Sequence, residues 1–272
     1  MGRAVLLAAV VHLACLDAPP ASTVQDAAAL PCERFGTWNV PFTVPGLSTV
    51  QGVSPTVDAD AHLIVWETSG PDNELAAAIG DGETFVANEG LVADLNTIDP
   101  ERNPTLSADG LTIWFTRGTE NATMLFVSHR ELERDPFPPA DKVEGVDVGP
   151  EAPDVWDDSN EIFFSVLGAD FDLAYATCEN LSTCTYRGLL PGLDQAMDDL
   201  YPTIRSDGLE LIFHSSSMNG LVQATRASAT SDFELTELLA FPGYDPELTA
   251  DGRRLYFAID GQLYRTDRSC IE

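Results

Sequence analysis

The sequence is dominated by a short frame that returns five times along the chain. Its clearest copy, residues 103–115, reads N-P-T-L-S-A-D-G-L-T-I-W-F, with a proline, an Asp-Gly turn and a terminal aromatic residue. Residues 201–213 and 245–257 repeat it closely, and residues 54–66 and 152–164 more loosely. A fixed period of this kind is typical of repeat architectures. The copies begin at Pro55, Pro104, Pro153, Pro202 and Pro246, which are 49, 49, 49 and 44 residues apart.

Each repeat predicts about four short antiparallel strands. In the second repeat, alternating runs cover residues 111–117 and 123–129, and helical periodicity is absent beyond the first residues of the chain. Four strands in about 45–50 residues is the size of one propeller blade. We therefore predict an all-β fold: a five-bladed β-propeller of four-stranded antiparallel blades. Each repeat proline is expected at the first position of an innermost strand, where no ladder hydrogen bond is lost.

The two ends of the folded region are expected to meet. The last repeat stops after its third strand, and a lone strand, Phe35–Val40, precedes the first repeat. We predict that this N-terminal strand completes the fifth blade and closes the ring. The repeated turns and aromatic residues are interpreted as structural, since they recur from unit to unit. The aromatic residues expected to pack between blades are Trp66, Phe115, Phe164, Phe213 and Phe257.

Composition narrows the range of partners. The 272 residues include 44 Asp and Glu against 14 Lys and Arg, a formal net charge of −30, and 44% of the residues are hydrophobic. That apolar content is sufficient for a packed core. Such an acidic chain repels a phosphate backbone, so no nucleic-acid partner is expected. Anionic membrane surfaces are disfavoured for the same reason, and membrane association is expected only through a lipid anchor.

The N-terminus has the features of an export signal. Residues 1–15 carry one positive charge and an apolar run that is too short to span a bilayer. The run ends in Leu13-Ala14-Cys15, which resembles a bacterial lipobox, although His12 stands where a leucine is usual. We predict lipidation of Cys15, a flexible tether at residues 16–31 and a propeller domain at residues 32–272. Plain signal cleavage near Ala21 or Ala27 is the alternative. The expected location is the periplasm or the outer membrane, or else the medium.

The remaining cysteines predict two disulfides. Cys178 and Cys184 flank a polar turn, and Cys32 and Cys270 lie at opposite ends of the folded region. An exported protein enters an oxidising compartment, where pairing is the expected state. The predicted pairs are therefore Cys178 with Cys184 and Cys32 with Cys270, the latter clamping the joint of the ring. Free buried thiols are the alternative.

The repeat frame resembles that of a known propeller family. The pattern P-x-[LIV]-S-x-D-G-x-x-[LI]-x-F, followed by a short strand with a basic end such as Ser128-His129-Arg130, is similar to the TolB-type β-propeller repeat. The resemblance covers nearly all residues from Phe35 onward. It implies an exported bacterial binding module, or the propeller of a larger peptidase. TolB itself has an additional blade and an additional domain, so the resemblance does not imply a role in the Tol system.

Motifs for catalysis are scarce. The sequence has no G-x-S-x-G, H-E-x-x-H, P-loop or dinucleotide-binding glycine motif. Of the four histidines, His214 stands out because it ends a strand beside three serines, where a hydrogen-bonded structural histidine is expected more than a catalytic one. The positions just before each repeat proline are expected at the tunnel mouth, where the innermost strands begin. The candidate ligand-binding residues there are Glu101, Arg102, Glu151, Asp198, Asp199, Tyr201, Tyr244 and Asp245.

Two functions remain open. The first is an exported binding module that holds a protein or glycan ligand of the cell envelope at the tunnel mouth, without catalysis. The alternative is a glycoside hydrolase or lyase that uses carboxylates at that mouth. No cofactor or metal site is predicted. Acidic pairs such as Asp170 with Asp172 offer ligands suited to Ca²⁺, yet none has a recognised loop spacing. We expect a monomer.

Overall fold

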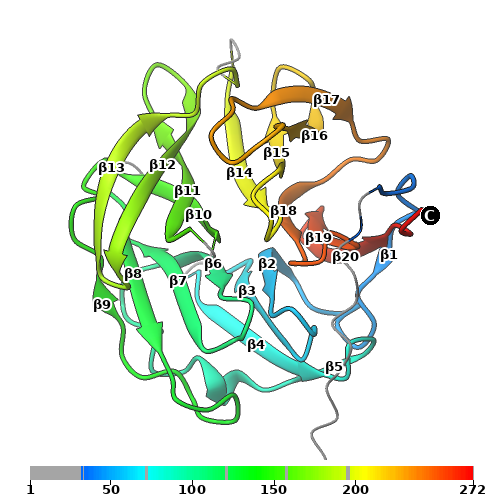
Figure 1. The fold of residues 1–272 in the computed structure, drawn as a ribbon. Coiled ribbons are helices and arrows are strands. Elements are labelled where there is room, and N and C mark those ends of the chain that lie inside the picture. The colour runs from blue at the N-terminus through cyan, green and yellow to red at the C-terminus, as the bar shows by residue number, and fades with distance from the viewer. Residues whose placement is uncertain are drawn as a thin grey trace, which may run out of the picture. The chain divides into compact units, whose positions relative to one another are not determined.

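The computed structural model describes residues 32, 34–70, 73–119, 122–156, 159–193 and 197–271. These residues form five four-stranded antiparallel sheets arranged around a common axis (Figure 1). The predicted five-bladed propeller is therefore confirmed. Cys15, the predicted signal at residues 1–15 and the predicted tether at residues 16–31 lie outside the described residues. No helix in the described ranges is both long enough and apolar enough to span a membrane.

Each blade is a meander in which successive strands pair from the axis outward. One short 3₁₀ helix, η1 (Glu89–Leu91), follows the first blade. The first three blades are β2 (Gly52–Val57) to β5, β6 to β9, and β10 to β13. Their other strands are β3 (Leu63–Thr68), β4 (Leu75–Gly80), β5 (Phe85–Ala87), β6 (Glu101–Leu106), β7 (Thr112–Arg117), β8 (Met124–His129), β9 (Asp141–Lys142), β10 (Pro150–Trp156), β11 (Glu161–Leu167), β12 (Phe171–Asn180) and β13 (Thr183–Leu189).

The fifth blade takes its outermost strand from the other end of the chain. Its order is β18-β19-β20-β1, so that the N-terminal β1 lies beside the C-terminal β20 (Figure 1). The strands of the last two blades are β14 (Asp199–Ile204), β15 (Glu210–Ser215), β16 (Gly220–Thr225), β17 (Glu234–Leu238), β18 (Tyr244–Leu248), β19 (Arg254–Ile259), β20 (Gln262–Asp267) and β1 (Phe42–Thr43).

The strand expected at Phe35–Val40 is displaced. The regular pairing begins only at Phe42, opposite Arg265. Upstream of it, the amides of Gly36 and Asn39 donate to the carbonyls of Ser269 and Asp267 at 2.8 and 2.9 Å. These two amides are three residues apart, whereas an antiparallel ladder bonds every second residue. The segment therefore follows β20 without forming a continuous strand.

The repeat prolines lie inside the innermost strands rather than at their starts, which corrects the sequence-based expectation. Pro55, for example, is the fourth residue of β2, and the register of β2 with β3 shifts between Val53 and Thr56. A β-bulge tolerates proline because the bulged residues leave the ladder. The residue before each proline has a φ between 48° and 58°. These five left-handed residues are Ser54, Asn103, Ala152, Tyr201 and Asp245.

The core is divided among the five seams between neighbouring blades. Each seam holds one hydrophobic cluster, and each cluster contains one of the five terminal aromatic residues of the repeat. Phe115, Phe164, Phe213 and Phe257 are fully buried, and Trp66 is 3% exposed. The predicted packing of these residues between blades is confirmed. Because each seam is filled separately, the axis itself is left to polar side chains.

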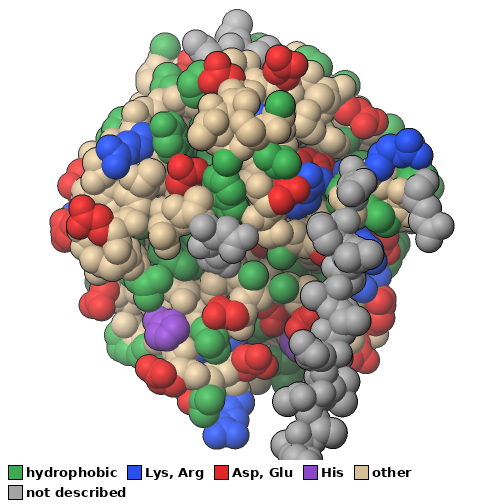
Figure 2. Space-filling view, in the orientation of Figure 1, with side chains coloured by type: hydrophobic (Ala, Val, Ile, Leu, Met, Phe, Trp, Pro, Cys, Tyr) green, Lys and Arg blue, Asp and Glu red, His purple; other side chains and the backbone are tan. Residues whose placement is uncertain are grey.

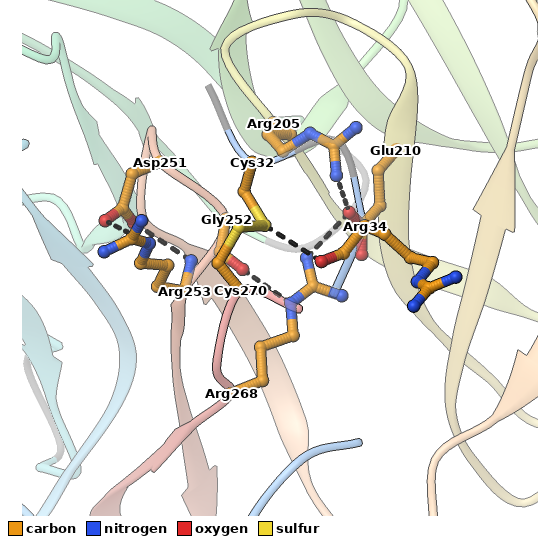
Figure 3. The surroundings of a disulfide bond; sticks show 9 residues. All are labelled: Cys32, Arg34, Arg205, Glu210, Asp251, Gly252, Arg253, Arg268 and Cys270. Atoms are coloured by element: carbon orange, nitrogen blue, oxygen red, sulfur yellow. Dashed lines mark hydrogen bonds and ion pairs between the residues drawn. A yellow bond between two sulfur atoms is a disulfide. The ribbon is translucent and has the colours of Figure 1, made fainter. Parts of the chain in front are cut away.

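Both predicted disulfides are present. Cys178 pairs with Cys184 across the β12–β13 hairpin. Cys32 pairs with Cys270, 238 residues away in sequence, beside the joint of the ring (Figure 3). Below this bond, Arg268 donates from Nε to the Gly252 carbonyl at 2.6 Å. Its guanidinium lies 3.9 Å from the centre of the Phe35 ring. The N-terminal segment is thus held to the fifth blade covalently and by stacking.

Candidate functional site

The bulges direct two rings of side chains toward one end of the axis. The residue two before each proline and the residue one before it surround a cavity of about 660 Å³, which we call the mouth cavity. The first ring is Val53, Arg102, Glu151, Leu200 and Tyr244, and all five line the cavity. Ser54, Asn103, Tyr201 and Asp245 of the second ring line it as well. Glu67, Leu167, Phe171, Ala258, Asp260 and Gly261 complete the wall.

Five of the eight residues proposed from the sequence line this cavity. They are Arg102, Glu151, Tyr201, Tyr244 and Asp245. Their positions follow from the repeat, since each comes one or two residues before a proline. The structure therefore brings together residues that are as many as 143 positions apart in the sequence.

The other three proposed residues lie outside the cavity. Glu101 and Asp199 stand three positions before their prolines and are fully buried, because alternation along a strand turns them toward the neighbouring blade. Glu101 accepts from Nε of Arg117 at 2.8 Å and from the Thr97 hydroxyl at 2.6 Å, which makes it part of a structural ion pair. Asp198 accepts a hydrogen bond from the Phe171 amide at 3.0 Å.

Glu67 is a cavity residue that the sequence reasoning missed. It lies on β3 opposite Val53 and is 7% exposed. The signal was present: Glu67 directly follows the terminal aromatic residue of its repeat. The equivalent positions in the other repeats carry Thr116, Ser165, His214 and Ala258, at the same intervals of 49, 49, 49 and 44 residues. Aligning the five copies at this position would have singled out the one carboxylate.

The carboxylates of the cavity are joined through neighbouring blades. The Asn103 side chain donates from Nδ2 to Glu151 Oε2 at 3.2 Å and accepts from the Ser54 hydroxyl at 2.9 Å. The Ser54 amide donates to Asp245 Oδ2 at 3.1 Å. The Asn103 amide donates to Glu67 Oε2 at 3.3 Å. These contacts fix the orientation of the acidic groups while leaving part of each group facing the cavity.

Burial weakens the acidity of these groups. Desolvation raises the pKa of Glu67 to about 7, and the charges of Asp245 and Glu151 act in the same direction. Desolvation also raises the pKa of Asp245 to about 6, partly offset by hydrogen bonds from Ser54. Burial and the same neighbouring carboxylates raise the pKa of Tyr201 well above its usual value. Tyr201 therefore remains a hydroxyl donor at neutral pH, and Glu67 holds its proton to higher pH than an exposed glutamate does.

His214 supports the wall of the cavity rather than facing into it. Its ring stacks on that of Tyr244, with 4.4 Å between the ring centres and 30° between the planes. It is 7% exposed, and burial lowers its pKa. A neutral imidazole that holds one face of Tyr244 is a positioning group. The other face of Tyr244, which is 53% exposed, stays available.

A second set of buried polar side chains lies deeper along the axis, at the residue after each proline. We call it the belt, and it separates the mouth cavity from a smaller cavity of about 100 Å³ at the far end. The repeat prolines surround a narrow waist of about 20 Å³ above it. The belt is Thr56, Thr105, Asp154, Thr203 and Glu247.

Belt side chains bond backbone amides of the adjacent blade. Asp154 accepts from the Thr105 hydroxyl at 2.9 Å and from the Ile204 amide at 2.6 Å. Glu247 accepts from the Thr56 hydroxyl at 2.8 Å and from the Val57 amide at 3.3 Å, which closes the seam between the last blade and the first. Burial raises the pKa of Asp154 to about 6. Burial also raises the pKa of Glu247 well above its usual value, with the charge of Asp154 as a second cause.

The site contains no recognisable metal centre among the described residues. No group of three His, Cys, Asp or Glu side chains is placed there to hold a metal ion. Asp157 and Asp158 fall outside the described ranges. The whole chain is nonetheless strongly acidic, and Figure 2 shows Asp and Glu side chains distributed over the visible face, with few Lys and Arg among them.

Comparisons with known proteins reveal the fold and nothing finer. No protein-family model matches the sequence, and no curated protein matches it. A family-43 glycoside hydrolase superposes with a TM-score of 0.61 at 8% identity, covering 85% of this chain and 93% of that one. A protein assigned as TolB from Agrobacterium tumefaciens gives a TM-score of 0.50 at 14% identity, covering 82% and 78%.

The TolB of Acinetobacter baumannii is also similar. It gives a TM-score of 0.48 at 15% identity and covers 81% of this chain, which spans only 55% of that protein's length. Identities this low carry no residue-level information. The five repeats, their Asp-Gly turns and the bulged innermost strands nevertheless give one consistent architecture. The described chain is a five-bladed β-propeller.

Proposed function

We propose that this protein is an exported binding module whose ligand enters the mouth cavity. One observation carries the proposal: a cavity of about 660 Å³ receives side chains from all five blades and contains polar groups without protein partners. Within the described chain, Glu67 Oε1 accepts no hydrogen bond and the Tyr201 hydroxyl makes none. A cavity of this size with a few converging polar groups is the usual form of a ligand site.

The cell envelope is the proposed location of this ligand. Two disulfides suit an oxidising compartment, and the N-terminal sequence has the features of an export signal. Lipidation of Cys15 remains a prediction, as does the monomeric state. The negative charge of the chain supports a protein or glycan partner and disfavours nucleic acid.

A capture experiment with a matched pair of variants tests the binding function. Leu200→Trp would fill the mouth cavity, whereas Ile98→Trp adds the same side chain at a fully exposed position outside it. The wild-type protein and Ile98→Trp should retain the same ligand from detergent-solubilised envelope fractions and from a glycan array. Leu200→Trp should lose it. Equal retention by both variants would place the binding surface elsewhere on the molecule.

Glycoside hydrolysis is the second candidate, and the carboxylates favour it. Glu67, with a pKa of about 7, would carry the proton that a leaving glycosidic oxygen needs. Glu151 or Asp245 would then act on the anomeric carbon, directly or through a water molecule. The superposition on a family-43 glycoside hydrolase supports the same reading of the fold. Hydrolysis of aryl glycosides that disappears in Glu67→Gln and in Glu151→Gln would establish this function in place of simple binding.

A further inference from the structure

The mouth cavity has an imbalance of charge. Four acidic side chains line it, Glu67, Glu151, Asp245 and Asp260, against the single base Arg102. Arg102 is itself engaged: when the Asn73 amide is oriented to satisfy its hydrogen bonds, its oxygen accepts from Nε and Nη2 of Arg102 at 3.0 Å each. One base faces four acids, so the cavity keeps a net negative charge when its carboxylates are ionised.

The acceptors in the cavity are incompletely used. Glu67 is more than nine-tenths buried, yet its carboxylate receives only the 3.3 Å bond from the Asn103 amide, on Oε2. Its other oxygen has no donor among the described residues. This oxygen is accessible from the cavity rather than sealed in the interior, so a ligand in the cavity can donate a hydrogen bond to it. The Tyr201 side chain lines the same cavity.

We propose that the mouth cavity binds a basic side chain of a partner protein, with a guanidinium or ammonium group placed between Glu67, Asp245 and the two tyrosines. This proposal rests on the proposed binding function and specifies its ligand class. A guanidinium is planar and offers five donors, which suits several carboxylate acceptors at once. Tyr201 and the exposed face of Tyr244 offer ring surfaces on which a cation is attracted.

Proton release should accompany such binding. The free cavity holds Glu67 with a pKa of about 7 and Asp245 with a pKa of about 6. A bound cation favours the ionised carboxylates, so it lowers both pKa values and displaces their protons. Affinity should therefore rise between pH 5 and pH 7 and level off above pH 8. The charged or titratable groups that face this point are Glu67 on β3, Arg102 on β6, Glu151 on β10, Tyr201 on β14, Tyr244 and Asp245 on β18 and Asp260 after β19.

A matched pair of small molecules isolates the role of charge. Butylguanidinium and its neutral isostere butylurea have the same shape, and titration calorimetry on the full chain measures the binding of each. We expect butylguanidinium to bind at least about tenfold more tightly at pH 8, since charge-assisted hydrogen bonds are roughly twice as strong as neutral ones. At pH 6.5 its binding heat should vary with buffer ionisation enthalpy, which reports released protons.

Two variants of equal charge change test the site. Glu67→Gln should weaken butylguanidinium binding at pH 8 by about tenfold and abolish most of the proton release. Glu131→Gln, at an exposed position outside the cavity, should leave both unchanged. Asp245→Asn provides a second test should Glu67→Gln prove poorly folded by circular dichroism.

Several results would overturn the inference. Equal affinity for butylguanidinium and butylurea would mean that the cavity binds ligands without regard to charge, and the proposed binding function would stand. Butylguanidinium binding that survives in both Glu67→Gln and Asp245→Asn would locate the cation site elsewhere. The wild-type protein could fail to bind butylguanidinium yet still retain envelope ligands that Leu200→Trp loses. That result would reject a basic side chain as the ligand and leave the proposed binding function standing. If the wild-type protein bound neither butylguanidinium nor any envelope or glycan ligand, both proposals would be rejected.

Discussion

Two sets of buried carboxylates lie along one axis and are used differently. Asp154 in the belt and Glu67 in the mouth cavity are equally buried, at 7% exposure. Asp154 accepts hydrogen bonds on both oxygens, including those from Thr105 and Ile204. Glu67 accepts one bond, at 3.3 Å, from Asn103. Burial and raised pKa are therefore shared by a structural acid and a cavity-facing acid, and the number of internal donors distinguishes them.

The largest expected effect tests the belt. Asp154→Ala would leave the Thr105 hydroxyl and the Ile204 and Val155 amides without their acceptor. We expect a loss of about 4 kcal/mol in the free energy of unfolding, measured by urea denaturation, because each unsatisfied buried donor costs about 1–3 kcal/mol. Thr203→Val, which removes the acceptor of the Leu248 amide and one hydroxyl that bonds Asp154, should cost about 1–2 kcal/mol. A small loss of stability in Asp154→Ala would mean that the hydrogen bonds of Asp154 contribute little to folding, so that the belt would not differ from the mouth cavity in this respect.

The next prediction compares two contacts that hold the ring of blades closed, the belt hydrogen bonds of Glu247 near the axis and the disulfide at the outer edge. Changing both Cys32 and Cys270 to Ser removes the clamp within the fifth blade but leaves the Glu247 bonds between the last blade and the first. We expect a loss of about 3 kcal/mol in the free energy of unfolding, with unchanged strand content, since native disulfides typically contribute about 2–4 kcal/mol. Thermal melts with circular dichroism would show it. An unchanged melting temperature would indicate that the belt alone closes the ring.

Glu67→Gln should stabilise the protein, whereas the two preceding changes destabilise it. A carboxylate whose pKa is raised from 4.5 to about 7 in the folded state opposes folding once the unfolded chain ionises. The stability lost by the wild-type protein grows from about pH 4.5 to pH 7 and is constant above. Removing the charge should raise the free energy of unfolding by about 2 kcal/mol at pH 8 and by nothing at pH 4. Destabilisation at pH 8 would assign Glu67 a structural role like that of Asp154.

The smallest effect on stability is expected at Tyr244. Because the side chain is 53% exposed, Tyr244→Ala should change the free energy of unfolding by less than about 0.5 kcal/mol. It should nevertheless weaken butylguanidinium binding about threefold, as expected for a cation on an exposed aromatic ring. Calorimetry and urea denaturation on the same preparation give both numbers. A stability loss without an affinity change would make Tyr244 a packing partner of His214 only.

The repeat made the fold predictable, and alternation explains where the site prediction failed. Proline spacing and terminal aromatic residues indicated five blades and their seams. The same spacing located Arg102 and Tyr201 near the mouth. It did not reveal the bulge, because proline is compatible with either a strand start or a bulge. Without the bulge, residues at different distances from the proline could not be assigned to different faces, so Glu101 and Asp199 were included with the cavity residues.

Glu67 was beyond that reasoning for a different reason. It lies on the second strand of its blade, and only the pairing of β3 with β2 brings it to the axis. The N-terminal closure was foreseen in outline from the missing strand. Its precise place was not, because the hydrogen bonds of Gly36 and Asn39 follow an irregular spacing that composition does not encode.

The bond between Cys32 and Cys270 also bears on how the molecule meets proteases. With these two residues joined, the intervening chain is a closed covalent loop. A single cut in an exposed connection, such as residues 131–135, would produce a nicked protein whose fragments remain tied together. Each blade would still have both neighbours. Two separate cuts are needed before a fragment can leave, which favours persistence in an environment where peptide bonds are regularly attacked.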